Sequence, residues 1–289
     1  MRMPKTLPLL MASILALAGC GDDKPTPTSS SATSLTAAAA PESKTLARLT
    51  IDPSGSATFD MKAPLENIRG TVKGFGGELE VELADLTKSR GKITIDLTTL
   101  ETRTFGEDEK DQKQTEHART WLEVGPKTAD DKKQKNRLAE FAIREIASPS
   151  TANVMTMSGD SRSVTMTAKG DFLLHGRSVT LTLDLACAFQ FDGSTLKSVS
   201  VKSVKPALVS LKAHDVQARD DAGEVVIAKT LELFGKKVAD DASVTFEVTA
   251  RPKGSTPLLV PPSAATASAT AAASSGAAAA PSGTAKVAP

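Results

Sequence analysis

Five thiol and imidazole side chains in this sequence have the chemistry for nucleophilic attack or metal binding: Cys20, Cys187, His117, His175 and His214. Thiols and imidazoles serve enzymes as nucleophiles, bases and metal ligands, but only when several of them meet at defined spacings. The sequence contains no CxxC pair and no HExxH, GxSxG or GxxxxGK(S/T) motif. We therefore expect a protein that is not an enzyme, with no catalytic residue, no cofactor and no metal site.

A structural role accounts for each histidine more simply. His175 lies in a predicted tight turn, where its ring would bond within the turn. His214 precedes Asp215 at the end of a predicted strand, which favours a surface pair. His117 falls in a segment with helical character. The enzyme alternative stays open and predicts a stoichiometric metal.

The first 20 residues predict a secretory signal. Arg2 and Lys5 form a basic start, and the apolar run from Leu7 to Leu17 is too short to span a bilayer comfortably. The run ends in Leu-Ala-Gly-Cys at Cys20, which resembles the lipobox of bacterial lipoproteins, whose Cys is lipidated and becomes the mature N-terminus. The resemblance implies a protein anchored through Cys20 to the inner or outer membrane of a bacterial envelope, facing the periplasm.

Low-complexity segments flank the remaining sequence. Residues 21–44 are dominated by Pro, Thr, Ser and Ala, and residues 252–289 by Ala, Ser, Pro and Thr. Neither segment has the apolar periodicity that builds a core, so we expect both to be disordered. The first would be a flexible linker between the anchor and a folded domain at 45–251.

The bulk composition excludes one class of partner and limits the core. The formal net charge is +1, so the chain lacks the basic stripe of a nucleic-acid-binding protein. Aromatic residues make up only 3% and Tyr is absent, so the interior must consist mainly of Leu, Val and Ile.

The clearest pattern is a predicted antiparallel hairpin from Val164 to Phe191. Its second half alternates apolar and polar residues, and successive strand side chains point to opposite faces of a sheet. One parity is apolar throughout: Val179, Leu181, Leu183, Leu185, Cys187, Phe189 and Phe191. Cys187 is therefore expected to be a small buried hydrophobe rather than a nucleophile.

Many further short strands are predicted, which is typical of a sandwich or barrel. They begin with a strand through Leu49, Ile51, Ala57 and Phe59 that is broken at 53–55. The others are predicted at 68–75, 79–83, 93–97, 138–147, 153–158, 196–204, 207–213 and 243–250. The exception is 107–124, which is rich in helix formers and places His117, Trp121 and Val124 at helical spacing. The charged stretch at 125–137 is expected to be a solvated loop.

Taken together, these segments resemble the YceI family of lipid-binding, lipocalin-like barrels. Gly170-Asp171-Phe172-Leu173-Leu174-His175-Gly176 resembles the family's most specific motif, G-D-L-T-I-H-G. Residues 51–77 are similar to its opening strands, 107–124 to its helical excursion and 243–250 to its closing strand. Gly55-Ser56 stands where the family often has His-Ser, so a polar contact at the pocket mouth differs.

The resemblance implies an all-β fold: an antiparallel, lipocalin-like barrel of about eight strands with a short helical excursion, flanked by disordered tails. It also implies a long apolar ligand, such as a polyisoprenoid, held inside the barrel. The expected lining consists of inward-facing residues: Leu79, Val81, Ile93, Ile95, Leu97, Phe172, Leu181, Leu183, Leu185, Phe189, Leu211 and Phe246. The alternative is a structural or interaction lipoprotein whose barrel is filled by its own side chains.

Overall fold

A computed structural model describes residues 28–62, 67–219, 225–226 and 240–253. The predicted signal, Cys20, the start of the linker and the tail beyond residue 253 lie outside these ranges. All the strands described below belong to one compact unit that ends at Ser255.

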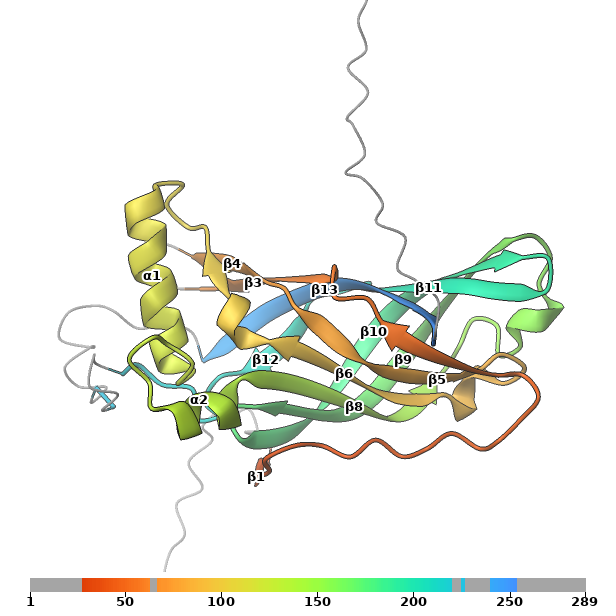
Figure 1. The fold of residues 1–289 in the computed structure, drawn as a ribbon, viewed down its shortest axis with the longest axis horizontal. Helices are drawn as coiled ribbons and strands as arrows, with labels where there is room; N and C mark the ends of the chain where they lie inside the picture. The colour runs from red at the N-terminus through yellow and green to blue at the C-terminus, as the bar shows by residue number, and fades with distance from the viewer. Residues whose placement is uncertain (1–27, 63–66, 220–224, 227–239, 254–289) are drawn as a thin grey trace, which may run out of the picture. The chain divides into compact units, whose positions relative to one another are not determined.

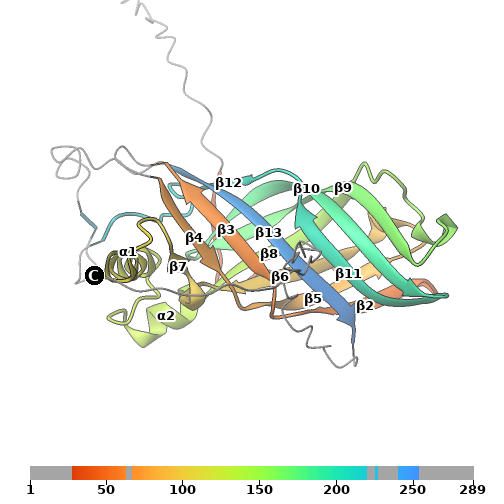
Figure 2. The ribbon, with the colours of Figure 1, turned by 90° about the horizontal axis from the view of Figure 1, so that it is seen from above.

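Eight antiparallel strands close into a barrel, as the sequence predicts (Figures 1 and 2). Neighbouring strands follow the order β10-β9-β8-β6-β5-β2-β13-β11, and β11 pairs with β10 again to close the ring. The strands are β2 Leu46–Ile51, β5 Phe75–Glu82, β6 Arg90–Asp96, β8 Leu138–Ala147, β9 Ser161–Leu174, β10 Arg177–Asp192, β11 Thr195–Ser203 and β13 Asp241–Pro252.

Four shorter strands extend this barrel towards one end. They are β3 Ser56–Met61, β4 Ile68–Val72, β7 Glu101–Thr102 and β12 Ala207–Ser210. β13 pairs first with β3 and then with β2, so these two strands form one long strand broken at 53–55, as predicted. Gly55 permits the bend, because a Cβ there would lie only 2.8 Å from Cγ1 of Val248.

The predicted central hairpin is confirmed as β9 and β10. They pair in register from Arg177 with Leu174 to Gln190 with Ser161. The two residues between them, His175 and Gly176, have φ values of 50° and 69°. A two-residue hairpin turn of this kind requires positive φ at both positions, which explains the Gly and strains the His.

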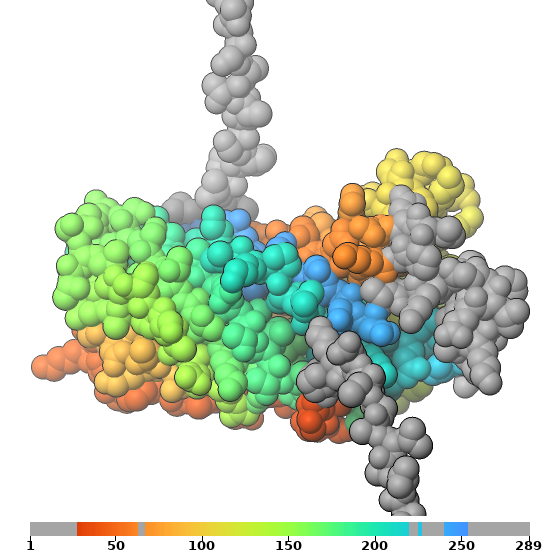
Figure 3. Space-filling view, turned by 180° about the vertical axis from the view of Figure 1, so that it is seen from behind, coloured from red at the N-terminus to blue at the C-terminus, as the bar shows by residue number. Residues whose placement is uncertain are grey.

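Figure 3 shows the face of the molecule on which β9–β11 lie (green to teal).

The predicted helix is confirmed as α1 (Asp108–Trp121), which lies at the barrel end that carries β4 and β7 (Figure 1). Its inward contacts differ from those expected. Ala118 and Leu122 pack into the core, followed by Val124, whereas His117 is exposed and Trp121 only half-buried. Of the three residues at helical spacing, only Val124 is therefore buried, and it lies beyond the end of the helix.

Two other predictions about local structure are wrong. The expected loop at 125–137 contains a helix, α2 (Asp130–Asn136), with two acidic residues in its first turn and basic residues in its last, an order that suits the helix dipole. The expected strand at 153–158 is a 3-10 turn, η3 (Val154–Thr156). Asn153 caps that turn by accepting the backbone N–H of Met155 at 2.9 Å.

Residues 28–44 lie along the outside of the barrel, from β1 (Ser30–Ser31) to the start of β2 (Figure 1). We call this segment the N-terminal strap. Glu140 on β8 fixes it by accepting the backbone N–H of Leu35 at 2.7 Å and the hydroxyl of Ser34 at 3.0 Å. Leu35 packs against Ala142 and Leu173. The strap therefore makes specific contacts with the barrel although its sequence lacks apolar periodicity.

Candidate ligand-binding site

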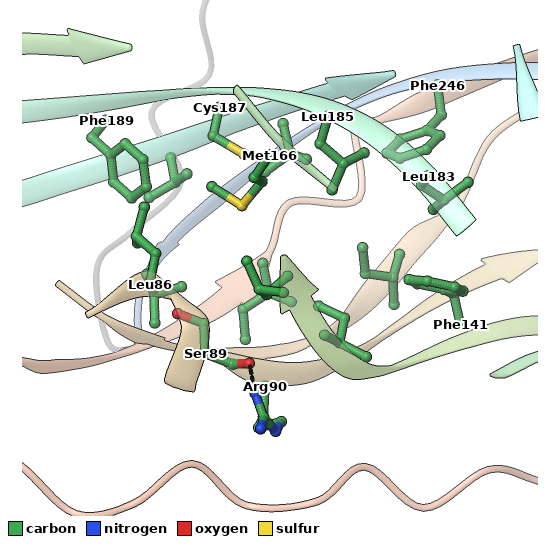
Figure 4. A pocket seen from close by; sticks show the side chains of 17 residues that line it. Leu86, Ser89, Arg90, Phe141, Met166, Leu183, Leu185, Cys187, Phe189 and Phe246 are labelled. Atoms are coloured by element: carbon green, nitrogen blue, oxygen red, sulfur yellow. Dashed lines mark hydrogen bonds between the residues drawn. The ribbon is translucent and has the colours of Figure 1, made fainter. Parts of the chain in front are cut away.

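The barrel interior is the candidate site, and β10 shows how the sequence builds it. Leu183, Leu185, Cys187 and Phe189 alternate inward along this strand and are all buried, whereas Thr182 and Gln190 face out. Facing strands contribute the rest of a continuous apolar wall. In the close view, Phe246, Met166 and these β10 side chains lie across the interior from Leu86 and Phe141 (Figure 4).

The cavity enclosed by this wall is small and apolar. Its volume is about 60 Å³, and its accessible wall contains no polar surface. Two polar residues border it, but both are bonded elsewhere. The Ser89 hydroxyl accepts the backbone N–H of Glu82 at 3.1 Å. Arg90 Nη1 donates to the carbonyls of Thr87 and Ser89 at 2.9 and 2.7 Å, and its side chain points away from the cavity (Figure 4).

The predicted lining residues fall into three groups. Seven of them border the cavity: Leu79, Val81, Ile93, Leu183, Leu185, Phe189 and Phe246. Ile95, Phe172 and Leu181 are partly buried against the same core. Leu97 is buried in a second apolar cluster, and Leu211 lies in the turn after β12, outside both clusters.

Eight further apolar residues border the cavity and were not predicted: Leu86, Phe141, Ile143, Ile146, Met166, Cys187, Val199 and Val201. For Met166 and Cys187 the signal was present, because both share the apolar parity of their strands. No such periodic signal exists for Leu86, because it lies in a 3-10 turn, η1 (Leu86–Lys88), and not in a strand.

The thiol of Cys187 is chemically quiet. It is a free cysteine, and burial among apolar groups raises its pKa to about 12. Since the thiolate is the reactive form, this thiol contributes only its volume and its apolar surface to the wall.

Different contacts close the two ends of the interior. At the α1 end, the second cluster gathers Val72, Leu100 and Leu122. At the other end, the Arg162 guanidinium lies 4.0 Å above the centroid of the Phe191 ring, and its Nη1 donates to the carbonyl of Val154 at 3.0 Å. An arginine at this rim covers the aromatic ring without exposing a charge to the cavity.

His214 is buried rather than the surface residue expected. It is 2% exposed, and its ring meets that of Phe172 edge-on with centroids 5.4 Å apart. Nδ1 donates to the carbonyl of Arg177 at 2.8 Å. Burial lowers the pKa of His214 more than the backbone hydrogen bonds raise it. The neutral ring therefore packs between the start of β10 and the turn after β12.

The described residues lack two features of other protein classes. No group of three or more His, Cys, Asp or Glu side chains lies close enough there to hold a metal ion. None of the helices in the same ranges combines the length and the apolar character needed to cross a bilayer.

Comparison with solved structures finds similar folds at low sequence identity. A polyisoprenoid binding domain from Saccharophagus degradans, implicated in plant cell wall breakdown, is 14% identical, with a TM-score of 0.41 over 72% of this chain and 99% of that one. BcnA of Burkholderia cenocepacia is 13% identical, with a TM-score of 0.41 over 68% and 95%. A mutant CJ YCEI protein, described as made for nanotechnology applications, is 13% identical, with a TM-score of 0.37 over 64% and 84%.

Sequence comparison assigns the family. No curated protein matches the chain significantly. The sequence profile of the YceI-like domain, however, matches residues 49–250, which contain six of the barrel strands in full and parts of β2 and β13. This protein is therefore a member of the YceI-like domain family.

Proposed function

We propose that this protein is a membrane-tethered envelope lipoprotein whose barrel binds a long apolar lipid of the polyisoprenoid type. The observation that carries the proposal is the apolar wall, which runs through the barrel without a polar group exposed to the cavity. Such an interior offers a ligand no directional bonds. Affinity would come from removing apolar surface from water, at about 0.8 kcal/mol for each buried methylene.

Binding a long chain requires the lining side chains to move apart. The cavity of about 60 Å³ is far below the roughly 300–1,000 Å³ of ordinary ligand pockets. Its wall is rich in side chains that change rotamer without breaking hydrogen bonds, among them Leu183, Leu185 and Met166. Met in particular adapts to irregular apolar neighbours. An expandable interior suits a ligand that is thin, flexible and apolar along its length.

The small volume also favours a second candidate function, a structural barrel that carries no ligand. In that case, the same side chains constitute an ordinary core, and the protein acts through its outer surface. The two functions make opposite predictions about lipid content and about substitutions that fill the cavity.

Lipid extraction and mass spectrometry of the purified protein distinguish them. We expect a lipid with a long apolar chain to co-purify with the wild type or to be taken up on incubation. Cys187→Leu adds volume inside the barrel and should reduce uptake, whereas Ala188→Leu, the next residue on the outer face of β10, should not. A folded wild-type protein that never carries or takes up lipid would refute the proposal and leave the structural barrel.

The tether is a separate part of the proposal and has a separate test. It rests on the Leu-Ala-Gly-Cys motif at Cys20. Residue 28, where the strap begins, is eight residues beyond Cys20, and a fully extended segment of that length spans at most about 29 Å. The lipid anchor would therefore hold the barrel close to the membrane surface.

A further inference from the structure

A second cavity lies outside the barrel, where the turn between β9 and β10 approaches α2. Its volume is about 510 Å³, and the N-terminal strap forms part of its wall. Four cationic side chains line it, Lys132, Lys135, Arg177 and Arg219, against the two carboxylates of Glu123 and Asp215. The described residues that line it therefore sum to a net charge of +2 before any charge on His175, which also lines it, is counted.

Glu123 does not make this cavity repel anions, because its oxygens are occupied by donors in the wall. Oε2 accepts from His175 Nε2 at 2.9 Å and from Asn136 Nδ2 at 3.2 Å. Oε1 accepts from Lys132 Nζ at 3.1 Å and lies 3.7 Å from Arg219 Nη1. Burial disfavours the charge of Glu123, but Lys132 and Arg219 stabilise the carboxylate and its pKa is lowered. The cationic partners of Glu123 therefore neutralise its negative charge within the cavity wall.

The backbone around this carboxylate is held in an unusual conformation. Glu123, His175 and Asp215 all have positive φ, at 52°, 50° and 56°, and only one other non-Gly residue in the described ranges does. Such strain persists where surrounding contacts fix the geometry. The backbone of these three lining residues is therefore held in a defined conformation.

Two cations remain available to a ligand. Among the described residues, the side-chain amine of Lys135 makes no hydrogen bond or ion pair, and it lies beside Gly176, 3.7 Å from where a Cβ would be. Arg177 donates from Nη1 to the neutral hydroxyl of Ser31 at 2.8 Å and forms no ion pair within the described part of the chain. An arginine fork beside a lysine and hydroxyl groups is the donor set that binds compact oxyanions such as phosphate.

We infer that this outer cavity is a binding site for a phosphate group, held chiefly by Lys135 and Arg177. Ser31 and Thr33 of the strap add hydroxyl donors at its edge. The phosphate has two chemically equivalent sources, free phosphate or the headgroup of an anionic lipid. In the cell, the lipid source would rest on the proposed tether, which would hold the strap that lines the cavity near a membrane. Free-phosphate binding depends on neither the tether nor the barrel interior.

The test uses the chain from residue 20 onward with Cys20→Ser, which retains every described residue but no acyl group. Inorganic phosphate is titrated by calorimetry at constant ionic strength. Co-sedimentation is measured with phosphatidylcholine vesicles, with and without phosphatidylglycerol. The test variant is Lys135→Gln with Arg177→Gln. The control is Lys169→Gln with Lys202→Gln, which removes the same charge from exposed positions on the outer barrel wall. Circular dichroism checks that each variant folds.

We expect saturable binding of at least one probe, weakened at least about tenfold in the Lys135/Arg177 variant and unchanged in the control. Phosphate binding assigns the site to free phosphate, and binding only to phosphatidylglycerol vesicles assigns it to a headgroup. No binding of either probe, or equal weakening in both variants, would overturn the inference. Lipid content of the barrel, measured on the same samples by mass spectrometry, reports separately on the proposed function.

Discussion

Leu183 gives the sharpest test of the inward face of the barrel. Its side chain is 7% exposed and borders the cavity, opposite Ala168 on β9. Truncation to Ala removes apolar contacts and enlarges the cavity, which costs about 2–5 kcal/mol in buried leucines generally. Space already lies beside this residue, and the neighbouring strands are fixed by their ladders. We therefore expect Leu183→Ala to cost about 3–5 kcal/mol of unfolding free energy.

Leu183→Asp adds a buried carboxylate to the same loss. Within the described wall of the cavity, the cation is Arg90, whose guanidinium is engaged by the carbonyls of Thr87 and Ser89. An unpaired polar group in such a site costs several kcal/mol more, about 2–7 kcal/mol for a neutral one. Together the two terms approach the roughly 5–15 kcal/mol total stability of a typical domain, so this variant should be largely unfolded.

Thr182→Asp is the matched control on the adjacent residue. Thr182 is exposed on the outer face and lies opposite Lys169 in register. A cross-strand pair of opposite charges contributes about 0.2–1 kcal/mol, which offsets the low strand propensity of Asp. Guanidinium unfolding followed by circular dichroism measures all three variants. A Thr182→Asp variant as unstable as Leu183→Asp would refute the assignment of inner and outer faces.

Three further predictions concern the thiol, the strap and the anchor. Burial raises the pKa of Cys187 to about 12 from 9.0, so the buried thiol contributes about 4 kcal/mol of stability below pH 9 that is lost as pH rises from 9 to 12. Urea unfolding across this range should therefore show a smaller fall in unfolding free energy for Cys187→Ala than for the wild type. Glu140→Gln replaces the charged acceptor that holds the strap and should increase proteolysis within 28–44. The control, Glu145→Gln on the exposed face of β8, should not. Equal cleavage of both variants would contradict the role of Glu140 in holding the strap. Cys20→Ser should move the protein from the membrane to the soluble fraction of cells, and a variant still recovered with membrane lipid would contradict a lipid tether.

The periodicity of the sequence sufficed for the long strands and for much of the inner wall. Strand side chains alternate strictly, so the apolar parity of 179–191 determines which residues face the interior once a sheet closes. The same rule places Leu79, Val81 and Ile93 on the inward face, where they border the cavity. The Gly-Asp…His-Gly turn also pointed to the family to which the chain belongs.

Periodicity failed where a contact partner is distant in sequence. His214 looked like a surface residue, but a carbonyl of β10 and the ring of Phe172 bury it. The strap has no pattern of its own and is fixed by Glu140, more than a hundred residues away. Leu97 keeps the inward parity, yet the 3-10 turn at the end of β6 places it in the second cluster.

The local sequence by itself therefore determined strand direction and facing, because the alternation of side chains is a property of each strand. Tertiary structure alone decided how much space the facing side chains leave between them. It also decided which charges meet outside the barrel, because Glu123, His175 and Lys135 come from separate segments that only the closed fold brings together. The cavity volume of about 60 Å³ and the cationic outer cavity both result from contacts between segments that are distant in sequence, so no single stretch of sequence encodes them.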